Sequence, residues 1–591
     1  MDNPFAVTSP EQLTTEQAEQ LFVEVFSDFP QVEKAGNAMI VGARGSGKSM
    51  MFRCLLPDVI MKRNKCQFSD LPFVAFHIPI KNLQLKLTEL ARFDDNYASS
   101  LINEHFFVVV ILQDICEQIT RYREQFRVSK EEAKSFYDDV FKINASIAGC
   151  DDITEINVDT DDCFNKIHSY SRTLYARFVR YITSLKPAGN PNLPLYNLPL
   201  LSFRMFLLPF LHGLRRLSGF PHGKNIHLFF DDADNLSKTQ TQVLNSWLGM
   251  RTQPIVSIKV STQLGKYKSY LSTDGTLVES PHDYQKINIS DKYTTSKTTY
   301  FRRVNEIVAK RLKSVGIECE PKDYFPEYKE QEEKIRQEKK RILEVWAREG
   351  RGNRPGDDVN RYARPNYIRD LGGISKSRST YRYAGFEQMV HLSSGVIRVF
   401  LETASLMFED TKKENPNTSL EMQYIPDAIQ NEVLRGFSED YMFGRFERLD
   451  VDTAPEKKGE GLSVVAKLRN LLISMGKTFY NILVSDRSER RVFSIALSNT
   501  PDKEVKDVLD FGVQTGYLHS STIGRKDGAG RTNLYIMNRI LAPQFNLDPT
   551  GFAGYLFVTN DVLKLAIYTQ RTLRAETDED NEEPRQLTLF D

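Results

Sequence analysis

The sequence predicts an α/β fold: a parallel sheet with a phosphate-binding loop, a large helical insertion and a C-terminal winged-helix domain. The loop, at 42–49, directly follows the apolar run 38–41 and opens into a helical segment. Further apolar strands are predicted at 73–80, 226–230 and 255–260, with helical patterns between them, as in a parallel sheet. After residue 500, a predicted helix is followed by a predicted hairpin.

Length and composition narrow the class of protein. A chain of 591 residues is too long for one ordinary core, and we expect about three or four domains. Basic and acidic residues number 78 each, so the net charge is zero and nucleic-acid contacts must use local patches. The six scattered cysteines argue against a disulfide framework or a structural zinc site. No secretion signal or apolar run of about 20 residues is found, so we expect a cytoplasmic protein, with nucleoid association left open and no membrane partner.

The loop at 42–49 has the pattern of a phosphate-binding P-loop. Its glycines let successive backbone N–H groups converge on a phosphate, and the helix start adds its positive dipole end. Lys48 can reach the β- and γ-phosphates of ATP, and Ser49 can ligate Mg²⁺. We therefore predict that ATP and Mg²⁺ are bound here, by Gly42, Ala43, Arg44, Gly45, Ser46, Gly47, Lys48 and Ser49.

An acidic pair at the end of the third strand supplies the partner that a P-loop needs. Asp231 is predicted to hold Mg²⁺ through water, and Asp232 to orient the attacking water. The alternative is an aspartate cluster that only forms a turn or caps a helix. At the end of the fourth strand, Thr262 or Gln263 occupies the place of a polar group facing the γ-phosphate.

A further cation is predicted near residue 398. Gly395 and Arg398, separated by two residues, begin an apolar helix. The alternative for Arg398 is an ordinary surface arginine on an amphipathic helix.

The order of these motifs resembles that of an AAA+ ATPase, and within that class the bacterial-type origin-recognition and replication-initiator proteins. The motifs are the P-loop, a long gap, Asp-Asp-Ala-Asp after a strand, Ser-Thr at the next strand end, and Ser-Gly-Val-Ile-Arg. The resemblance implies a helical lid whose sensor-2 arginine, here Arg398, reaches the nucleotide. It also implies a winged helix after the lid.

The sequence departs from the pattern of these ATPases in three respects. The insertion between the two nucleotide motifs is unusually large, Asp232 replaces the commoner glutamate, and the sensor-1 position lacks a clear asparagine. These departures put fast turnover and ring assembly in question, and homo-oligomerisation stays open. Arg251, Arg302 and Arg303 are candidates for an arginine finger acting on a neighbouring subunit.

The expected domain organisation has five parts. They are an N-terminal segment at 1–35, an ATPase core at 36–300 with the helical insertion at about 85–215, a helical lid at 301–450, a winged-helix domain at 451–571 and an acidic tail at 572–591. Within the lid, 327–349 is expected to be a solvated charged helix and 350–380 a loop.

The winged-helix region offers a surface for DNA. Arg525, Lys526 and Arg531 lie on the glycine-rich wing, where cationic side chains can follow phosphates. The preceding helix carries four acidic residues that oppose phosphate: Asp502, Glu504, Asp507 and Asp510. A winged helix used for protein contacts is therefore the alternative.

The chain ends in a short apolar peptide on an acidic tail. Gln586, Leu587, Leu589 and Phe590 look like the peptide that docks on the bacterial sliding clamp. The alternative is that the tip folds back onto its own domain.

We therefore expect an ATP-binding, ATP-hydrolysing protein that acts on DNA or on a DNA-bound complex. Two alternatives remain: a nucleotide-gated switch that signals to an effector, with defence against phage as one setting, and an adaptor recruited by the clamp.

Overall fold

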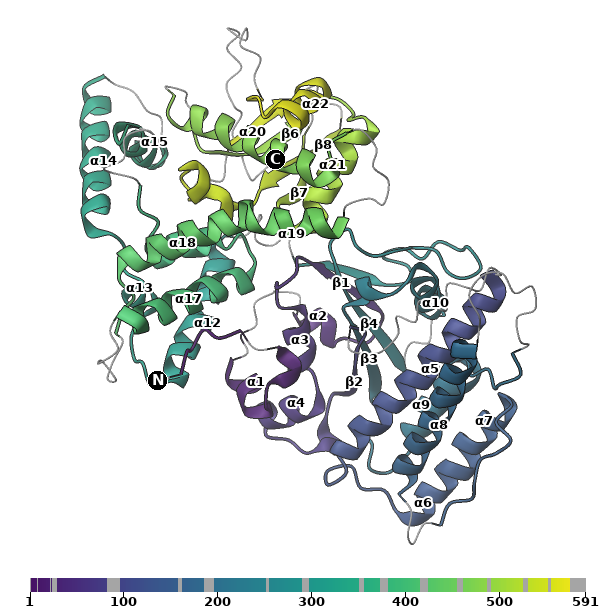
Figure 1. Cartoon of the computed structure of the whole chain (residues 1–591). Helices are drawn as coiled ribbons and strands as arrows, with labels where there is room; N and C mark the ends of the chain where they lie inside the picture. Colours follow the sequence, from purple (N-terminus) through teal and green to yellow (C-terminus); the bar gives the residue numbers. More distant parts are fainter. Residues whose placement is uncertain are drawn as a thin grey trace. The chain divides into compact units, whose positions relative to one another are not determined.

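The computed structural model describes residues 2–7, 9–21, 23, 29–81, 96–157, 162–184, 196–250, 255–289, 297–349, 355–372, 381–414, 423–453, 461–485, 490–524, 530–550 and 554–573. The chain forms two compact units (Figure 1). The first unit comprises Thr8–Gly42 and Gly47–Ile289. The second comprises Met1–Val7, Ala43–Ser46 and Ser290–Asp591.

A five-stranded parallel sheet forms the centre of the first unit. Its order is β2, β3, β4, β1 and β5, with bounds Ala38–Gly42 (β1), Phe73–Pro79 (β2), Asn225–Asp231 (β3), Val256–Gln263 (β4) and Gln285–Asn288 (β5). Pro79 pairs with Asp231, and Val41 pairs with Thr262, so the carboxyl ends of these strands meet at one edge. The predicted parallel sheet is confirmed. β5 was not predicted, because four residues with three polar side chains give no apolar run.

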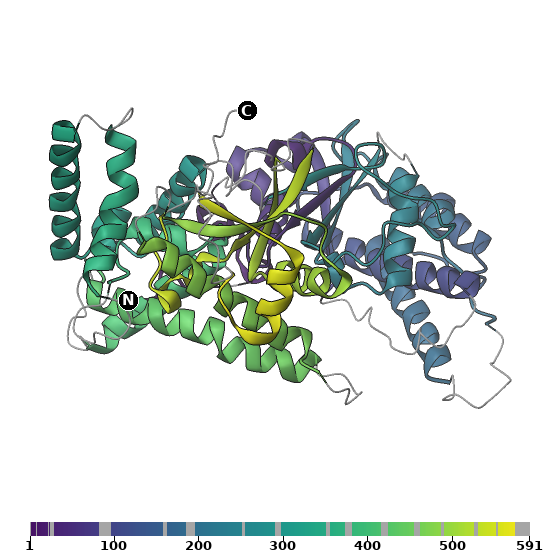
Figure 2. The same ribbon diagram turned by 90° about the horizontal axis from the view of Figure 1, so that it is seen from above.

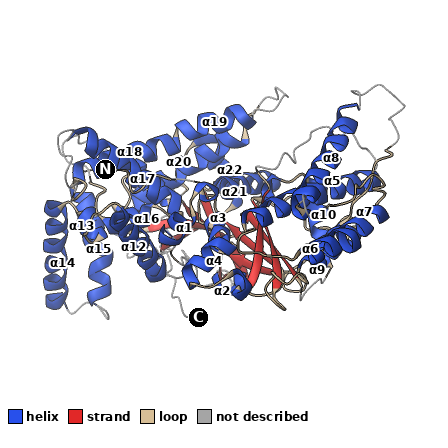
Figure 3. Cartoon of the chain, turned by 90° about the horizontal axis from the view of Figure 1, so that it is seen from below, coloured by secondary structure: helices blue, strands red, loops and turns tan. Residues whose placement is uncertain are grey.

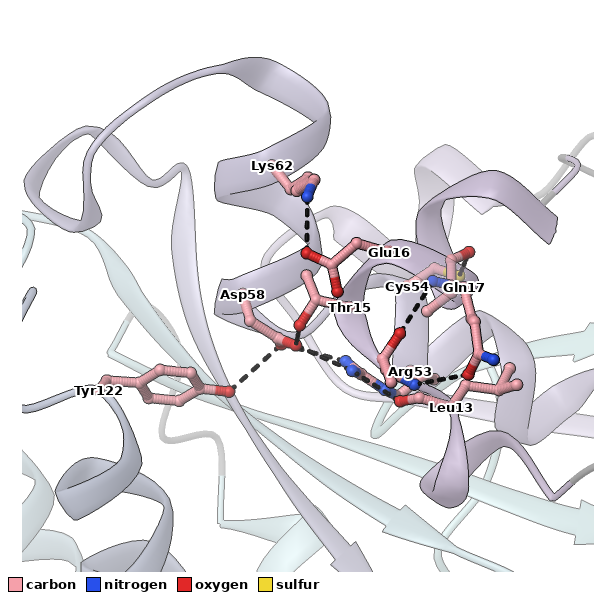
Figure 4. Close-up of polar contacts among 11 residues, drawn as sticks. Leu13, Thr15, Glu16, Gln17, Arg53, Cys54, Asp58, Lys62 and Tyr122 are labelled. Carbon is pink, nitrogen blue, oxygen red and sulfur yellow. Dashed lines mark hydrogen bonds and ion pairs between the residues drawn. The ribbon is translucent and has the colours of Figure 1, made fainter.

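Short helices flank the P-loop strand. They are η1 (Pro10–Gln12), α1 (Thr15–Leu21), α2 (Phe29–Glu33), α3 (Lys48–Cys54), α4 (Pro57–Asn64) and η2 (Phe68–Asp70). Figure 4 shows how α1, α3 and α4 are tied together at Asp58. Arg53 of α3 donates two hydrogen bonds to the Asp58 carboxylate, at 3.0 and 2.8 Å, and one to the carbonyl of Leu13 at 3.2 Å. Thr15 and Tyr122 also donate to Asp58, at 2.6 and 3.4 Å.

The described part of the insertion between β2 and β3 is helical (Figure 3). Its elements are α5 (Asn96–Arg121), α6 (Lys130–Ser135), the π-helix η4 (Phe136–Lys142), α7 (Ile143–Ile147), α8 (Cys163–Ser184), the π-helix η5 (Phe203–Leu207) and α9 (Leu208–Leu214). α5 packs on α8 through Phe106 and Phe178, whose rings are 5.0 Å apart. The stretch Ser99–Arg121 is long and apolar enough to span a membrane, but 72% of its most apolar window is buried within the protein.

A short helical turn, η6 (Ala233–Asn235), and α10 (Lys238–Gly249) follow β3. Trp247 of α10 is fully buried and donates its indole N–H to Glu104 of α5, at 3.0 Å. This bond ties the insertion to the helix that follows the acidic strand.

Helices make up the first part of the second unit. They are α12 (Lys297–Ser314), α13 (Pro321–Tyr324), α14 (Lys329–Glu349), α15 (Pro355–Asp370), α16 (Phe386–Leu392), α17 (Ile397–Glu414), α18 (Asp427–Met442) and α19 (Gly444–Thr453). α14 and α15 lie side by side, as Figures 1 and 2 both show. The prediction of a loop over 350–380 is wrong across α15. Its Val359 and Ala363 pack on Ile335 and Ile342 of α14, a partner that sequence composition does not reveal.

A second sheet with four strands completes this unit. The strands of this sheet have the order β7, β8, β6 and β9. The elements of this part of the chain are α20 (Val464–Leu483), β6 (Val492–Leu497), α21 (Lys503–Thr515), β7 (Leu518–Gly524), β8 (Arg531–Met537), η7 (Arg539–Phe545), β9 (Gly554–Val558) and α22 (Asn560–Thr569). The expected helix and antiparallel hairpin are present as α21, β7 and β8. The sequence did not predict β6, β9 or their parallel pairing. Assignment to the winged-helix class stays a prediction.

Replacing Asp58 by alanine is expected to destabilise the first unit. Arg53 and Asp58 expose only 12% and 23% of their side chains, so the loss of the carboxylate leaves a shielded guanidinium without its partner. We expect the free energy of unfolding to fall by about 1–3 kcal/mol, measured by urea unfolding. The control is Lys62→Ala, which removes an exposed pair with Glu16 and should leave the unfolding midpoint unchanged. Equal effects of the two variants would contradict this role of Asp58.

Candidate functional site

The loop between β1 and α3 has the backbone of an anion-binding turn. Gly45 and Gly47 have φ values of 81° and 101°, a region that residues with a Cβ rarely adopt. Ser46 closes the turn by donating its hydroxyl to the carbonyl of Ala43, at 2.7 Å. Gly47 is the N-cap of α3, so the first N–H groups of this helix have no partner within the helix itself.

Lys48 is the first residue of α3 and is only 6% exposed. Its Nζ donates to the carbonyl of Gly42, at 3.0 Å, which holds the ammonium over the end of β1. Lys48 also lowers the pKa of Asp232, although burial and two neighbouring aspartates raise that pKa overall. The ammonium therefore lies between the end of β1 and the acidic pair.

Asp231 ends β3 with its carboxylate buried, and the residue is 2% exposed. Burial alone would raise its pKa, but hydrogen bonds with His77, Ser261 and Ser49 outweigh burial and lower it. Ser261 bonds to Oδ1, and the Nε2 of His77 lies 3.3 Å from Oδ2. The carboxylate is therefore ionised at neutral pH, and the Ser49 hydroxyl is beside it.

Asp232 adopts a left-handed backbone conformation, with φ 57° and ψ 44°. Its N–H group donates to Oδ1 of Asp231 at 3.1 Å and to Oγ of Ser261 at 2.9 Å. Its side chain makes no capping hydrogen bond to η6. Burial, Asp231 and Asp234 raise the pKa of its carboxyl group. Asp234 has a structural contact, because its Oδ1 accepts the N–H of Gln263 at 3.1 Å.

The end of β4 contributes Ser261 to this cluster. Thr262 is buried, and its hydroxyl lies 3.4 Å from the carbonyl of Gln263. Since successive strand residues face opposite sides of a sheet, Ser261 and Thr262 do not share a face. The contact of Ser261 with Asp231 was not predicted from the sequence. The placement of Thr262 or Gln263 toward the γ-phosphate stays a prediction.

His77 lies in the strand predicted at 73–80, and its ring contacts the acidic strand. It lies on β2, and the register of β2 on β3 brings its ring to Asp231. Gln118 of α5 holds the backbone of His77 from the open edge of the sheet, donating to its carbonyl at 2.8 Å and accepting its N–H at 3.0 Å. The helical insertion thus supports the residue that orients Asp231.

Asp114 lies one helical turn before Gln118 on α5. Burial, followed by the charge of Glu117, raises its pKa to about 7, while the nearby His77 lowers it. Its Oδ2 is shielded from solvent and has no hydrogen-bond partner among the described residues. Two carboxyl groups therefore lie near His77: that of Asp231 on β3 and that of Asp114 on α5 of the insertion.

Arg398 lies at the start of α17, in the same unit as Gly45. Its N–H group donates to the carbonyl of Gly45 at 3.2 Å, and a Cβ added to Gly45 would come within 2.6 Å of the Arg398 Cβ. Glu402 is close enough to Arg398 and Arg44 for both cations to lower its pKa against the raising effect of burial. Arg398 therefore contacts the phosphate-binding loop through its backbone. Its role as the lid arginine that reaches the nucleotide stays a prediction.

The other predicted residues that the structure describes have contacts within their own unit. Arg302 and Arg303 lie on α12 beside Glu306, at 4.0 and 3.6 Å. Arg531 begins β8, and its guanidinium donates to the hydroxyl of Thr522 across the hairpin, at 3.1 Å. Outside the described residues lie Arg251, Arg525 and Lys526, and also Gln586, Leu587, Leu589 and Phe590.

Replacing His77 by alanine is expected to weaken Mg²⁺-dependent ADP binding by roughly tenfold, because Asp231 loses the group that orients it. ADP binding in EDTA should change less than twofold. Both quantities are measured by calorimetric titration. His77→Gln, whose amide can still donate to Asp231, should recover part of the affinity. Equal losses with and without Mg²⁺ would show that His77 only maintains the sheet.

Comparison with known proteins adds the family. The family model described as ORC-CDC6-like matches residues 3–355 and 345–557. Among solved structures, the chain is similar to Cdc6p from Pyrobaculum aerophilum, with 12% identity, coverage of 96% of this chain and 98% of that one, and a TM-score of 0.30. It is also similar to the ORC2 protein of Aeropyrum pernix, solved in ADPNP–ADP complexes, with 9% identity, the same coverages and a TM-score of 0.30.

No curated protein matches this chain. The two structural similarities are too low to carry an argument, so the assignment depends on the family model, which spans most of the sequence. The predicted resemblance is confirmed: the chain belongs to the ORC-CDC6-like family.

Proposed function

We propose that the chain binds ATP with Mg²⁺, hydrolyses it, and couples the nucleotide state to engagement of DNA or a DNA-bound complex. The observation that carries the nucleotide part is the convergence of Lys48, Ser49 and the ionised Asp231 where β1 and β3 end. Membership of the ORC-CDC6-like family supports it.

The donor set fits a magnesium ion. Asp231 provides a buried ionised carboxylate, and Ser49 provides a hydroxyl already bonded to it. Both are oxygen ligands of the kind that Mg²⁺ prefers. When bound, Mg²⁺ supplies positive charge to the phosphate oxygens. Lys48 adds a second cation, and the glycine loop adds backbone N–H groups.

Asp232 is our candidate for orienting the attacking water. Its backbone is held by Asp231 and Ser261, while its carboxyl group makes no capping bond. The raised pKa of this carboxyl group makes it a stronger base when ionised than an exposed aspartate.

The first experiment measures ADP binding and the ATPase rate in the full chain. Lys48→Ala should weaken nucleotide binding and abolish turnover. Asp232→Asn should bind nucleotide within about threefold of wild type and lower the rate by roughly a hundredfold. Asp234→Asn is the matched control, because an asparagine oxygen can still accept the N–H of Gln263. A wild-type chain that neither binds nor hydrolyses ATP would refute the proposal.

The C-terminal sheet is our candidate for the DNA contact. Of the acidic residues on α21 that oppose phosphate, two are paired with cations. Asp502 caps the helix and lies 3.0 Å from Nζ of Lys564, and Glu504 bonds to Lys467 at 2.5 Å. These pairs reduce the negative charge that α21 presents. Arg531 is exposed at the start of β8.

The second experiment measures duplex DNA binding against salt concentration. Arg531→Ala should weaken binding and reduce the salt slope by about one. Lys313→Ala, which removes an exposed cation from α12, is the control of equal charge and should leave the slope unchanged. Identical slopes for the two variants would exclude Arg531 from the contact. The C-terminal clamp peptide stays a prediction.

A further inference from the structure

A cavity of about 430 Å³ opens in the first unit, away from the phosphate-binding loop. It is lined by the end of α9, the segment that leads into β3, and Ile255 just before β4. These are the amino ends of the strands, whereas Asp231 lies at the carboxyl end of β3. The two places are separated by the length of β3, about 20 Å at 3.3 Å per residue.

Cationic and titratable side chains dominate the polar lining of this cavity. They are His212, Arg215, Arg216 and His222. Among the described residues, no carboxylate pairs with either arginine or with His222. Arg215 donates instead to the carbonyls of Lys224 and Gly223, at 2.6 and 2.7 Å, so its charge is not neutralised.

Two further observations show that positive charge gathers here. Burial lowers the pKa of His212, and the charges of Arg216 and then Arg215 lower it further. Glu132 is an acidic residue that contacts the cavity lining at Ser218. Its carboxylate already accepts the N–H and hydroxyl of Ser218, at 3.2 and 2.6 Å. Cations at the end of α9 also favour the helix dipole, but that effect does not require them to line a cavity.

The cavity also has an apolar wall. Leu217, Phe220 and Ile255 line it beside the cations. Phe220 is held by Phe126, with ring centroids 6.4 Å apart, and Gly219 packs so tightly on Arg127 that an added Cβ would lie 2.4 Å from its carbonyl oxygen. The wall is therefore a fixed part of the fold.

We propose that this cavity binds an organic phosphate of nucleotide size, as a second site separate from the P-loop. Arg216 can recognise phosphate through paired N–H donors, while Arg215, whose Nε and Nη2 are bonded to carbonyls, adds positive charge. The apolar wall suits a flat organic group. The volume lies within the range of small-molecule pockets. A concave site of this size suits a small ligand better than the convex phosphate ridge of a duplex.

The test uses adenosine 5′-monophosphate as the probe and the full chain saturated with Mg·ADP, which occupies the P-loop. Calorimetric titration should show one further site. Arg216→Ala should weaken AMP binding at least tenfold, because it removes a donor to the phosphate. The Arg216 side chain is exposed and has no hydrogen bond to the described residues, so its removal should not disturb the fold. Lys224→Ala, a neighbouring exposed cation outside the lining, should change it less than twofold. Adenosine without phosphate should bind at least tenfold more weakly than AMP.

Several outcomes would overturn the proposal. They are no AMP binding, equal effects of Arg216→Ala and Lys224→Ala, or AMP binding that Lys48→Ala abolishes and Arg216→Ala spares. If AMP does not bind, but a twelve-nucleotide single strand binds and its binding depends on Arg216, then these residues contact nucleic acid and not a small ligand. Retained AMP binding in Lys48→Ala would support the second site even if the P-loop proposal failed.

Discussion

The buried carboxylate of Asp231 is the constraint on which the candidate site depends. A charged group at the end of a central strand must be satisfied by hydrogen bonds or it would take up a proton. Three neighbouring elements meet this need: His77 from β2, Ser261 from β4 and Ser49 from α3. Because β2, β3 and β4 are adjacent and parallel, His77 and Ser261 reach the same carboxylate, and Ser49 reaches it from the start of α3. The same bonds that keep Asp231 ionised hold its oxygens beside the Ser49 hydroxyl.

The helical insertion acts on this point through α5. Gln118 bonds both backbone groups of His77, and Asp114 lies close enough to His77 for the pKa of Asp114 to be affected. The same helix accepts the indole N–H of Trp247, from the helix that follows the acidic pair. The insertion is therefore connected to Asp231 through Gln118 and His77.

The second unit shows how pairing changes the meaning of charge. Asp502 and Glu504 appear in the sequence as groups that repel phosphate, yet both are bonded to lysines from neighbouring helices. In the charged helix α14, Ile335 and Ile342 pack on α15. α14 also forms an ion pair with α15, in which Glu332 and Arg364 lie 2.9 Å apart. Charge counts along the sequence describe such segments poorly because the partners are distant in the chain.

The sequence by itself determined the phosphate-binding loop, the strands that end in Asp231 and near Thr262, the helix and hairpin after residue 500, and the family. These features are local, since glycine spacing, apolar runs and turn residues act within a few positions. Only the tertiary structure decided that Ser261, rather than Thr262, faces Asp231, that His77 contacts it, and that β5, β6, β9 and α15 form. Each depends on strand register or on a packing partner in another element, and the periodicity of a segment carries no information about either.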